Sequence, residues 1–148
     1  MPSISAHTTV NATPQQAFDY LADFRRHKEW AAHPLEIKPS SEGAVGTGYS
    51  FTSESKMMGK HHSTVNVTAF EAPGRLVYVA EDDTGRWQHE FLIRPAGNGN
   101  ATEITKTTSM LRGSLMNKVM ATFLLPFVGG KIIRQDMVRI KGRLEGGA

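Results

Sequence analysis

The sequence contains no cysteine. This absence excludes disulfide bonds, thiolate nucleophiles, zinc–thiolate sites and iron–sulfur clusters, and it permits a reducing compartment. Residues 1–5 have neither the basic start nor the apolar stretch of a secretory signal peptide. We therefore predict a cytoplasmic protein.

Long apolar runs are also missing. The nearest approach to a membrane-spanning length is residues 119–133, and it is interrupted by Pro126, Gly129, Gly130 and Lys131. Because a span needs about 20 mostly apolar residues, we predict no transmembrane segment. A peripheral contact with a membrane remains open.

Motifs for metal or nucleotide chemistry are absent too. The six histidines show no His-Glu-x-x-His spacing, and His61 and His62 are adjacent, so a strand would send them to opposite faces. The glycine-rich residues 43–48 lead into a strand rather than a helix, unlike a nucleotide-binding loop, and no Gly-x-Ser-x-Gly motif occurs. We predict no metal and no cofactor.

Positive charge is in modest excess, with a net charge of +3. Much of the excess lies near the C-terminus, in Lys131, Arg134, Arg139, Lys141 and Arg143. Nucleic-acid binding favours basic residues interleaved with exposed aromatic ones, and this segment lacks that pattern. We interpret it as a solvated helix face and predict no nucleic-acid partner.

The 148 residues suit one domain, residues 1–148, with one hydrophobic core. Residues 4–10 alternate between apolar and polar, which predicts a strand. Thr13, Pro14 and Gln16 then form a helix start in which Thr13 is the N-cap and Gln16 its capping-box partner. A second short helix is predicted for residues 25–30.

Six alternating segments follow, and short turns rich in Gly, Asp and Asn connect several of them. They contain Leu35/Ile37, Tyr49 to Ser55, Val65 to Ala69, Leu76 to Ala80, Trp87 to Ile93 and Thr102 to Thr108. Ser114 can cap a long final helix, which Pro126 and the glycines after it should kink. The predicted fold is α+β: a curved antiparallel sheet of about seven strands around a long C-terminal helix, in the order β-α-α-β6-α.

This order, with Val10-Asn11-Ala12-Thr13-Pro14-Gln15-Gln16-Ala17-Phe18 near the start, resembles the START-like superfamily of polyketide cyclases, dehydrases and lipid carriers. Residues 43–48, 70–76 and 102–105 are similar to other parts of the helix-grip pattern. The resemblance implies an elongated cavity between the sheet and the long helix. It carries over no catalytic residues, because members of this superfamily include carriers, hormone receptors and cyclases.

Strand alternation indicates which side chains face that cavity. Charged Arg86, Glu90 and Arg94 should face water, which turns Trp87, His89 and Phe91 inward. The same argument applied to the other strands and the last helix gives a set of candidate ligand-binding residues: Tyr49, Phe51, Ser53, Met57, Tyr78, Trp87, His89, Phe91, Lys106, Thr108, Met120, Phe123 and Phe127. For the aromatic members, and for Met120, a simple core position is the favoured interpretation, although in a hollow fold the two roles overlap.

Three functions remain open. The leading hypothesis is binding of a small hydrophobic molecule, such as a lipid, polyketide or aromatic metabolite, by a monomer or homodimer. The second is a cyclase or dehydratase in which His89 or Lys106 removes a proton while Tyr78 holds an oxygen. The third is a peripheral membrane or partner-protein contact through residues 116–128 with Lys118 and Lys131.

Overall fold

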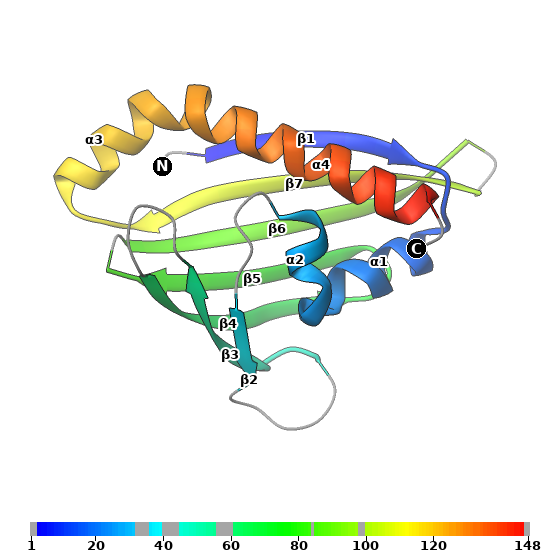
Figure 1. Cartoon of the computed structure of the whole chain (residues 1–148), viewed down its shortest axis with the longest axis horizontal. Helices are drawn as coiled ribbons and strands as arrows, with labels where there is room; N and C mark the ends of the chain where they lie inside the picture. The colour runs from blue at the N-terminus through cyan, green and yellow to red at the C-terminus, as the bar shows by residue number, and fades with distance from the viewer. Residues whose placement is uncertain are drawn as a thin grey trace.

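The computed structural model describes residues 3–31, 36–39, 45–55, 61–83, 85–97 and 100–146 (Figure 1). The elements follow in the order β1 (Ser3–Val10), α1 (Pro14–Ala22), η1 (Phe24–Arg26), α2 (His27–Trp30), β2 (Glu36–Pro39), β3 (Ser50–Ser55), β4 (His61–Glu71), β5 (Arg75–Asp82), β6 (Gly85–Ala96), β7 (Ala101–Arg112), α3 (Leu115–Leu124), η2 (Leu125–Gly129) and α4 (Gly130–Glu145).

All seven strands form one sheet, in the order β1-β7-β6-β5-β4-β3-β2. Every neighbouring pair is antiparallel, and strands β2 to β7 lie beside their neighbours in sequence. The first strand instead pairs with the last, which places the two ends of the chain's β region side by side. The predicted α+β fold, with its curved sheet and long C-terminal helix, is confirmed.

Helix α1 begins as the sequence predicts. The Thr13 hydroxyl accepts a hydrogen bond from the Gln16 N–H at 3.2 Å, and the Gln16 side-chain oxygen accepts one from the Thr13 N–H at 2.9 Å. Pro14 occupies the first turn, where no N–H is needed. The helix buries Ala17, Phe18 and Leu21 against the sheet.

The core occupies one end of the concave face, beneath α1, α2 and the C-terminal part of α4. Val10, Ile104, Phe91 and Leu76 come from four different strands and are fully buried there. From the helical side, the core includes Phe18, Phe24, Trp30, Met137 and Ile140. These contacts fix α4 across the sheet.

The other end of the concave face is less covered. Ile4, Thr108, His89 and Trp87 share the inward face with the buried residues of their own strands, yet each remains partly exposed. The predicted inward faces of β6 and β7 are therefore observed, although burial along them is uneven. The cause is the path of the C-terminal helix.

That helix is interrupted where the sequence predicts. Pro126 lies within η2, a π-helical segment between α3 and α4. Proline lacks the N–H that a regular α-helix uses, and π-helical turns accommodate such breaks. Helix α4 packs on β1, α2 and α1, whereas α3 contacts mainly η2 and extends away from the sheet (Figure 1).

Candidate functional site

A buried ion pair lies between the sheet and α4. Lys106 of β7 points inward, and its Nζ donates a hydrogen bond to Oδ2 of Asp136 on α4 at 3.3 Å. Their side chains are only 8% and 7% exposed. Because an unpaired buried charge is costly, each group stabilises the charged form of the other.

Aromatic rings surround the lysine. Its Nζ lies 5.0 Å from the centre of the Trp30 ring and 5.8 Å from that of Phe91, within the range of cation–π attraction. The His27 ring packs on Trp30, with ring centres 4.5 Å apart. Trp30 and His27 both belong to α2, so this short helix forms one wall of the site.

A second polar group lies beside the first on the same face of the sheet. Tyr78 and His89 are cross-strand partners whose rings stack 5.0 Å apart. The next strand supplies Thr108, whose hydroxyl oxygen is 3.3 Å from Nδ1 of His89. Tyr78, His89 and Lys106, the three predicted catalytic candidates, therefore share one face.

Three buried polar atoms have no hydrogen-bond partner within the described part of the chain. They are Nε1 of Trp30, Nδ1 of His27 and Oγ of Ser53. Most buried polar groups in folded proteins are paired, and leaving one unpaired costs about 1–3 kcal/mol. Two of these residues, Trp30 and His27, lie beside the Lys106–Asp136 pair. We therefore take this region as the candidate site.

Burial controls protonation here. It lowers the pKa of His27 to about 3, and the positive charge of Lys106 acts in the same direction. Burial also lowers the pKa of His89 well below its usual value, again with help from Lys106. The pKa of Lys106 is lowered by burial, while Asp136 opposes that change, and the pKa of Tyr78 is raised by burial. Both imidazoles are therefore neutral at pH 7.

The structure places most predicted ligand-binding residues on the inward face. Phe51, Ser53, Tyr78, Phe91 and Lys106 are buried there. The part-exposed members are Tyr49, Trp87, His89 and Thr108. Met57 lies outside the described residues.

The predicted inward position of three helix residues is wrong. Met120, Phe123 and Phe127 are 52%, 69% and 78% exposed. The sequence pattern placed them on an apolar stripe, and such a stripe normally faces the core. Here α3 diverges from the sheet, so its apolar stripe has no core to cover.

Sequence reasoning missed three residues of the site. Asp136 looked like part of a solvated basic helix face, although it shares a helical stripe with the buried Ile133 and Ile140. That stripe was the available signal. Trp30 and His27 lie on a helix of only four residues, too short for a reliable amphipathic pattern.

Metal binding has no structural support in the described part of the chain. Within it, no group of three or more histidine or acidic residues is close enough to hold a metal ion. The described polar atoms of the site are instead a cation, a carboxylate, two imidazoles, an indole N–H and hydroxyls. Such groups suit hydrogen bonding to an organic ligand.

The sequence profile of the polyketide cyclase/dehydrase and lipid transport family matches residues 1–145. The chain belongs to this family. No curated protein matches the sequence.

Solved structures with the same fold are numerous. A START superfamily protein from Mycobacterium smegmatis has a TM-score of 0.77 at 14% identity, with 99% of each chain covered. A protein from Thermus thermophilus has a TM-score of 0.76, also at 14% identity and 99% coverage of both chains. A protein from Arthrobacter aurescens, at 14% identity, has a TM-score of 0.73 over 97% of this chain and 86% of its own. At these identities the likeness supports the fold alone.

We expect the ion pair of this family member to be strongly coupled. Asp136→Leu should lower the free energy of unfolding by about 3–5 kcal/mol, because it leaves the buried Lys106 cation without its carboxylate. Lys106→Met should cost less, because Asp136 keeps Arg139 at 3.9 Å. The double variant should recover most of that loss. Urea unfolding of the four proteins measures the coupling.

Additive losses in the double variant would show that the two groups do not stabilise each other. The matched control is Lys141→Met, which removes a partly exposed lysine that pairs with Glu145 on α4 and with the Thr9 carbonyl of β1. Its effect should stay within about 1 kcal/mol.

The two neutral histidines predict a pH dependence of stability. In the unfolded chain each histidine has a pKa near 6.5. Folding lowers both pKa values, to about 3 for His27, so both side chains stay neutral to lower pH. Below pH 6.5 the unfolded chain therefore binds more protons, and stability falls as the pH falls. The limiting slope is about 1.4 kcal/mol per pH unit for each histidine.

Urea unfolding between pH 7.5 and 5.0 tests this expectation. His27→Gln and His89→Gln should each give a shallower slope below pH 6.5. His7→Gln is the control, because His7 is exposed on β1, and its slope should match that of the unmodified protein. Equal slopes in all four proteins would refute the assignment.

Proposed function

We propose that the protein binds a small, largely apolar molecule that carries a hydrogen-bond acceptor, held between the concave face of the sheet and the helices. The observation that carries the proposal is the indole N–H of Trp30. It is buried, and it has no acceptor within the described residues.

The neighbours of Trp30 define the chemistry of the acceptor. An indole nitrogen can only donate a hydrogen bond. The cation of Lys106 lies 5.0 Å from the indole ring, so the local field favours an electron-rich oxygen. Neutral His27, which packs on the same ring, offers one ring nitrogen as a donor or acceptor according to its tautomer. A carbonyl or carboxylate oxygen fits this set.

The less covered end of the concave face offers a place for the apolar body of the ligand. His89 retains exposed surface, yet burial lowers its pKa strongly. Both properties fit a side chain that lines a recess inside the molecule. Trp87, Ile4 and Thr108 lie on the same face and are also partly exposed. The family's link to lipids and polyketides is consistent with an apolar guest.

The first experiment is native mass spectrometry of the protein as purified. We expect a bound species whose mass disappears on denaturation and which organic extraction recovers. A carbonyl or carboxylate in the extracted molecule would support the proposal. An extracted hydrocarbon with no acceptor would contradict it.

A titration tests the acceptor directly. The chain has two tryptophans, so Trp87→Phe leaves Trp30 as the single fluorophore. We expect 2-tetralone, an apolar ketone, to change the emission of Trp30 and to bind more tightly than tetralin, its counterpart without oxygen. One hydrogen bond of about 1 kcal/mol corresponds to roughly a fivefold difference in Kd.

The removal of the donor completes the comparison. Trp30→Phe should weaken binding of 2-tetralone roughly fivefold and leave that of tetralin nearly unchanged, as measured by calorimetry. Trp87→Phe is the matched aromatic comparison: because Trp87 lies on the face proposed for the apolar body of the guest, it should change both affinities by a similar factor and keep their ratio. Equal affinity of the two probes for the unmodified protein would refute an acceptor-binding site at Trp30.

Enzymatic proton transfer is a second candidate, favoured by the arrangement of Tyr78, His89 and Lys106 on one face. His89 is neutral, and Thr108 holds its Nδ1, so the ring is oriented. Its low pKa makes it a weak base, however, and Asp136 already engages Lys106. Binding therefore ranks before catalysis.

Deuterium exchange into 2-tetralone in D₂O, followed by NMR, tests this second function. A catalytic His89 predicts exchange faster than in buffer, lost in His89→Gln, and nearly constant between pH 6 and 8 because the base is already neutral. Exchange at the same rate as in buffer would show that the protein does not catalyse this proton transfer, and it would leave binding as the proposed function.

A further inference from the structure

The segment formed by α3 and η2 exposes an unusual amount of apolar surface. Leu115, Met116, Phe123 and Phe127 are between 69% and 80% exposed. Val119, Met120, Leu124 and Val128 are also exposed. Soluble proteins rarely present such a contiguous apolar patch without a partner.

The orientation of α3 explains why these side chains are uncovered. The better covered stripe of the segment consists of Asn117, Ala121, Leu125 and Gly129. At Gly129 an added Cβ would lie 3.0 Å from Ile4 of β1, which identifies this stripe as the one facing the body. The large exposed apolar side chains therefore lie on other faces of the segment, where they do not pack on the core.

Along the chain, the charges next to the segment have one sign. From Ile104 to Gln135 the sequence contains no aspartate or glutamate, although it includes Lys118, Lys131 and Arg134. All three of these cations are exposed. An apolar surface whose charged neighbours in the chain are cations is complementary to the interface of an anionic membrane. Glu81, which lies near the start of α3 in space, is paired with Arg112 of β7.

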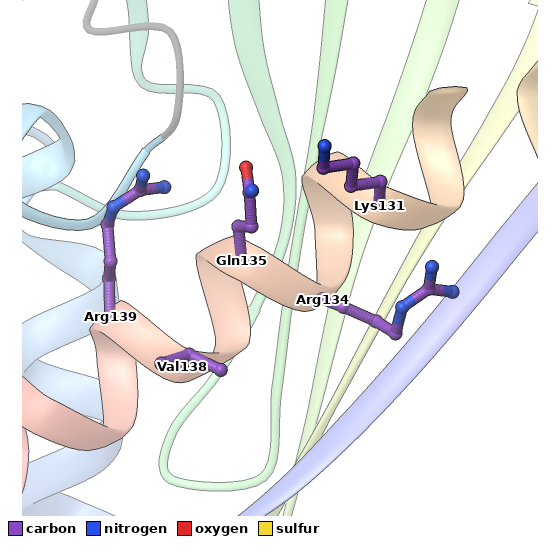
Figure 2. A pocket seen from close by; sticks show the side chains of 5 residues that line it. All are labelled: Lys131, Arg134, Gln135, Val138 and Arg139. Atoms are coloured by element: carbon purple, nitrogen blue, oxygen red, sulfur yellow. The ribbon is translucent and has the colours of Figure 1, made fainter. Parts of the chain in front are cut away.

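A groove on α4 continues the basic surface. It is a shallow, open groove of about 290 Å³, lined by Lys131, Arg134, Gln135, Val138 and Arg139 (Figure 2). Figure 2 shows Lys131, Gln135 and Arg139 in a row along one side of the helix and Arg134 on the other. Val138, 70% exposed, supplies an apolar contact among them. Basic groups beside an apolar contact suit an anionic lipid headgroup.

We propose that α3 and η2 dock in the plane of an anionic lipid membrane, with Phe123 and Phe127 inserted and Lys118, Lys131 and Arg134 at the headgroups. The helical run Leu115–Glu145 is long and apolar enough to cross a membrane by length and composition. Its α4 part, however, is held by Ile133, Met137 and Ile140 in the interior. The ten residues of α3 and five of η2 are too few for a span, which takes about 20.

Vesicle co-sedimentation of the full chain tests the proposal. We expect binding to vesicles of 70% phosphatidylcholine and 30% phosphatidylglycerol, and much weaker binding to pure phosphatidylcholine. Phe127→Asp should reduce binding at least about tenfold, because it replaces an inserted ring with a charge. Phe127→Leu, which remains apolar, should bind within about threefold of the unmodified protein. The exposure of Phe127 means that both variants should keep the thermal unfolding midpoint.

The basic residues are tested separately. Lys131→Gln should weaken binding to the anionic vesicles about fivefold, since a lysine near such a surface contributes about a factor of five. Lys28→Gln is the matched control, because Lys28 is an exposed lysine of α2 on another part of the molecule. It should bind like the unmodified protein.

Two results would overturn the proposal. One is anionic-vesicle binding unchanged by Phe127→Asp. The other is a stable dimer in light scattering that Phe127→Asp converts to a monomer, with no vesicle binding by either form, which would assign the apolar face to a second copy of the chain. Neither result bears on the Trp30 site, because vesicle binding is measured without 2-tetralone.

Discussion

The ion pair between Lys106 and Asp136 is the constraint on which the interior depends. It joins the sheet to the helix that covers it, in a region where neither charge is stable alone. Within that helix it acts on the same face as the apolar contacts, because Ile133 and Ile140 lie on the same stripe as Asp136. The position of α4 over the sheet and the polarity of the candidate site thus have a common origin.

The same ion pair shapes the chemistry of the site. The positive charge of Lys106 adds to burial in lowering the pKa of His27 and His89, so both imidazoles stay neutral. A neutral imidazole beside an indole N–H and a compensated cation makes a site suited to hydrogen bonding with one end of a mostly apolar molecule. It is less suited to strong acid–base catalysis, which requires a pKa nearer the working pH.

The concave face of the sheet has two unlike ends. One is filled by α1, α2 and α4, and it accounts for the hydrophobic core. The other lies towards α3, which precedes the break at Pro126 and diverges from the sheet, so that its own apolar side chains and those of the strands are incompletely covered. A guest between helix and sheet and a membrane against the outer side of α3 would cover different surfaces, so the two proposals are compatible.

Much of the fold followed from local signals. The capping box at Thr13 and Gln16 is a contact between near neighbours, so the sequence contains all of its parts. Strand alternation likewise assigned Phe91 and Lys106 to the inward face, because a strand with one buried side must place alternate residues there. The interruption at Pro126 depends only on the chemistry of proline.

The contacts across the interior could not be predicted from the sequence. Asp136 is 30 residues from Lys106, and Trp30 is 76 residues from it, so neither contact has a local signature. The apolar stripe of α3 is the same in sequence whether it covers a core or faces outward, and only the path of the helix after β7 distinguishes them. The sequence by itself determined the elements and their inward faces, because these depend on short-range backbone and burial rules. Tertiary structure alone decided which polar groups meet and which apolar face stays open, because those outcomes depend on how distant elements pack.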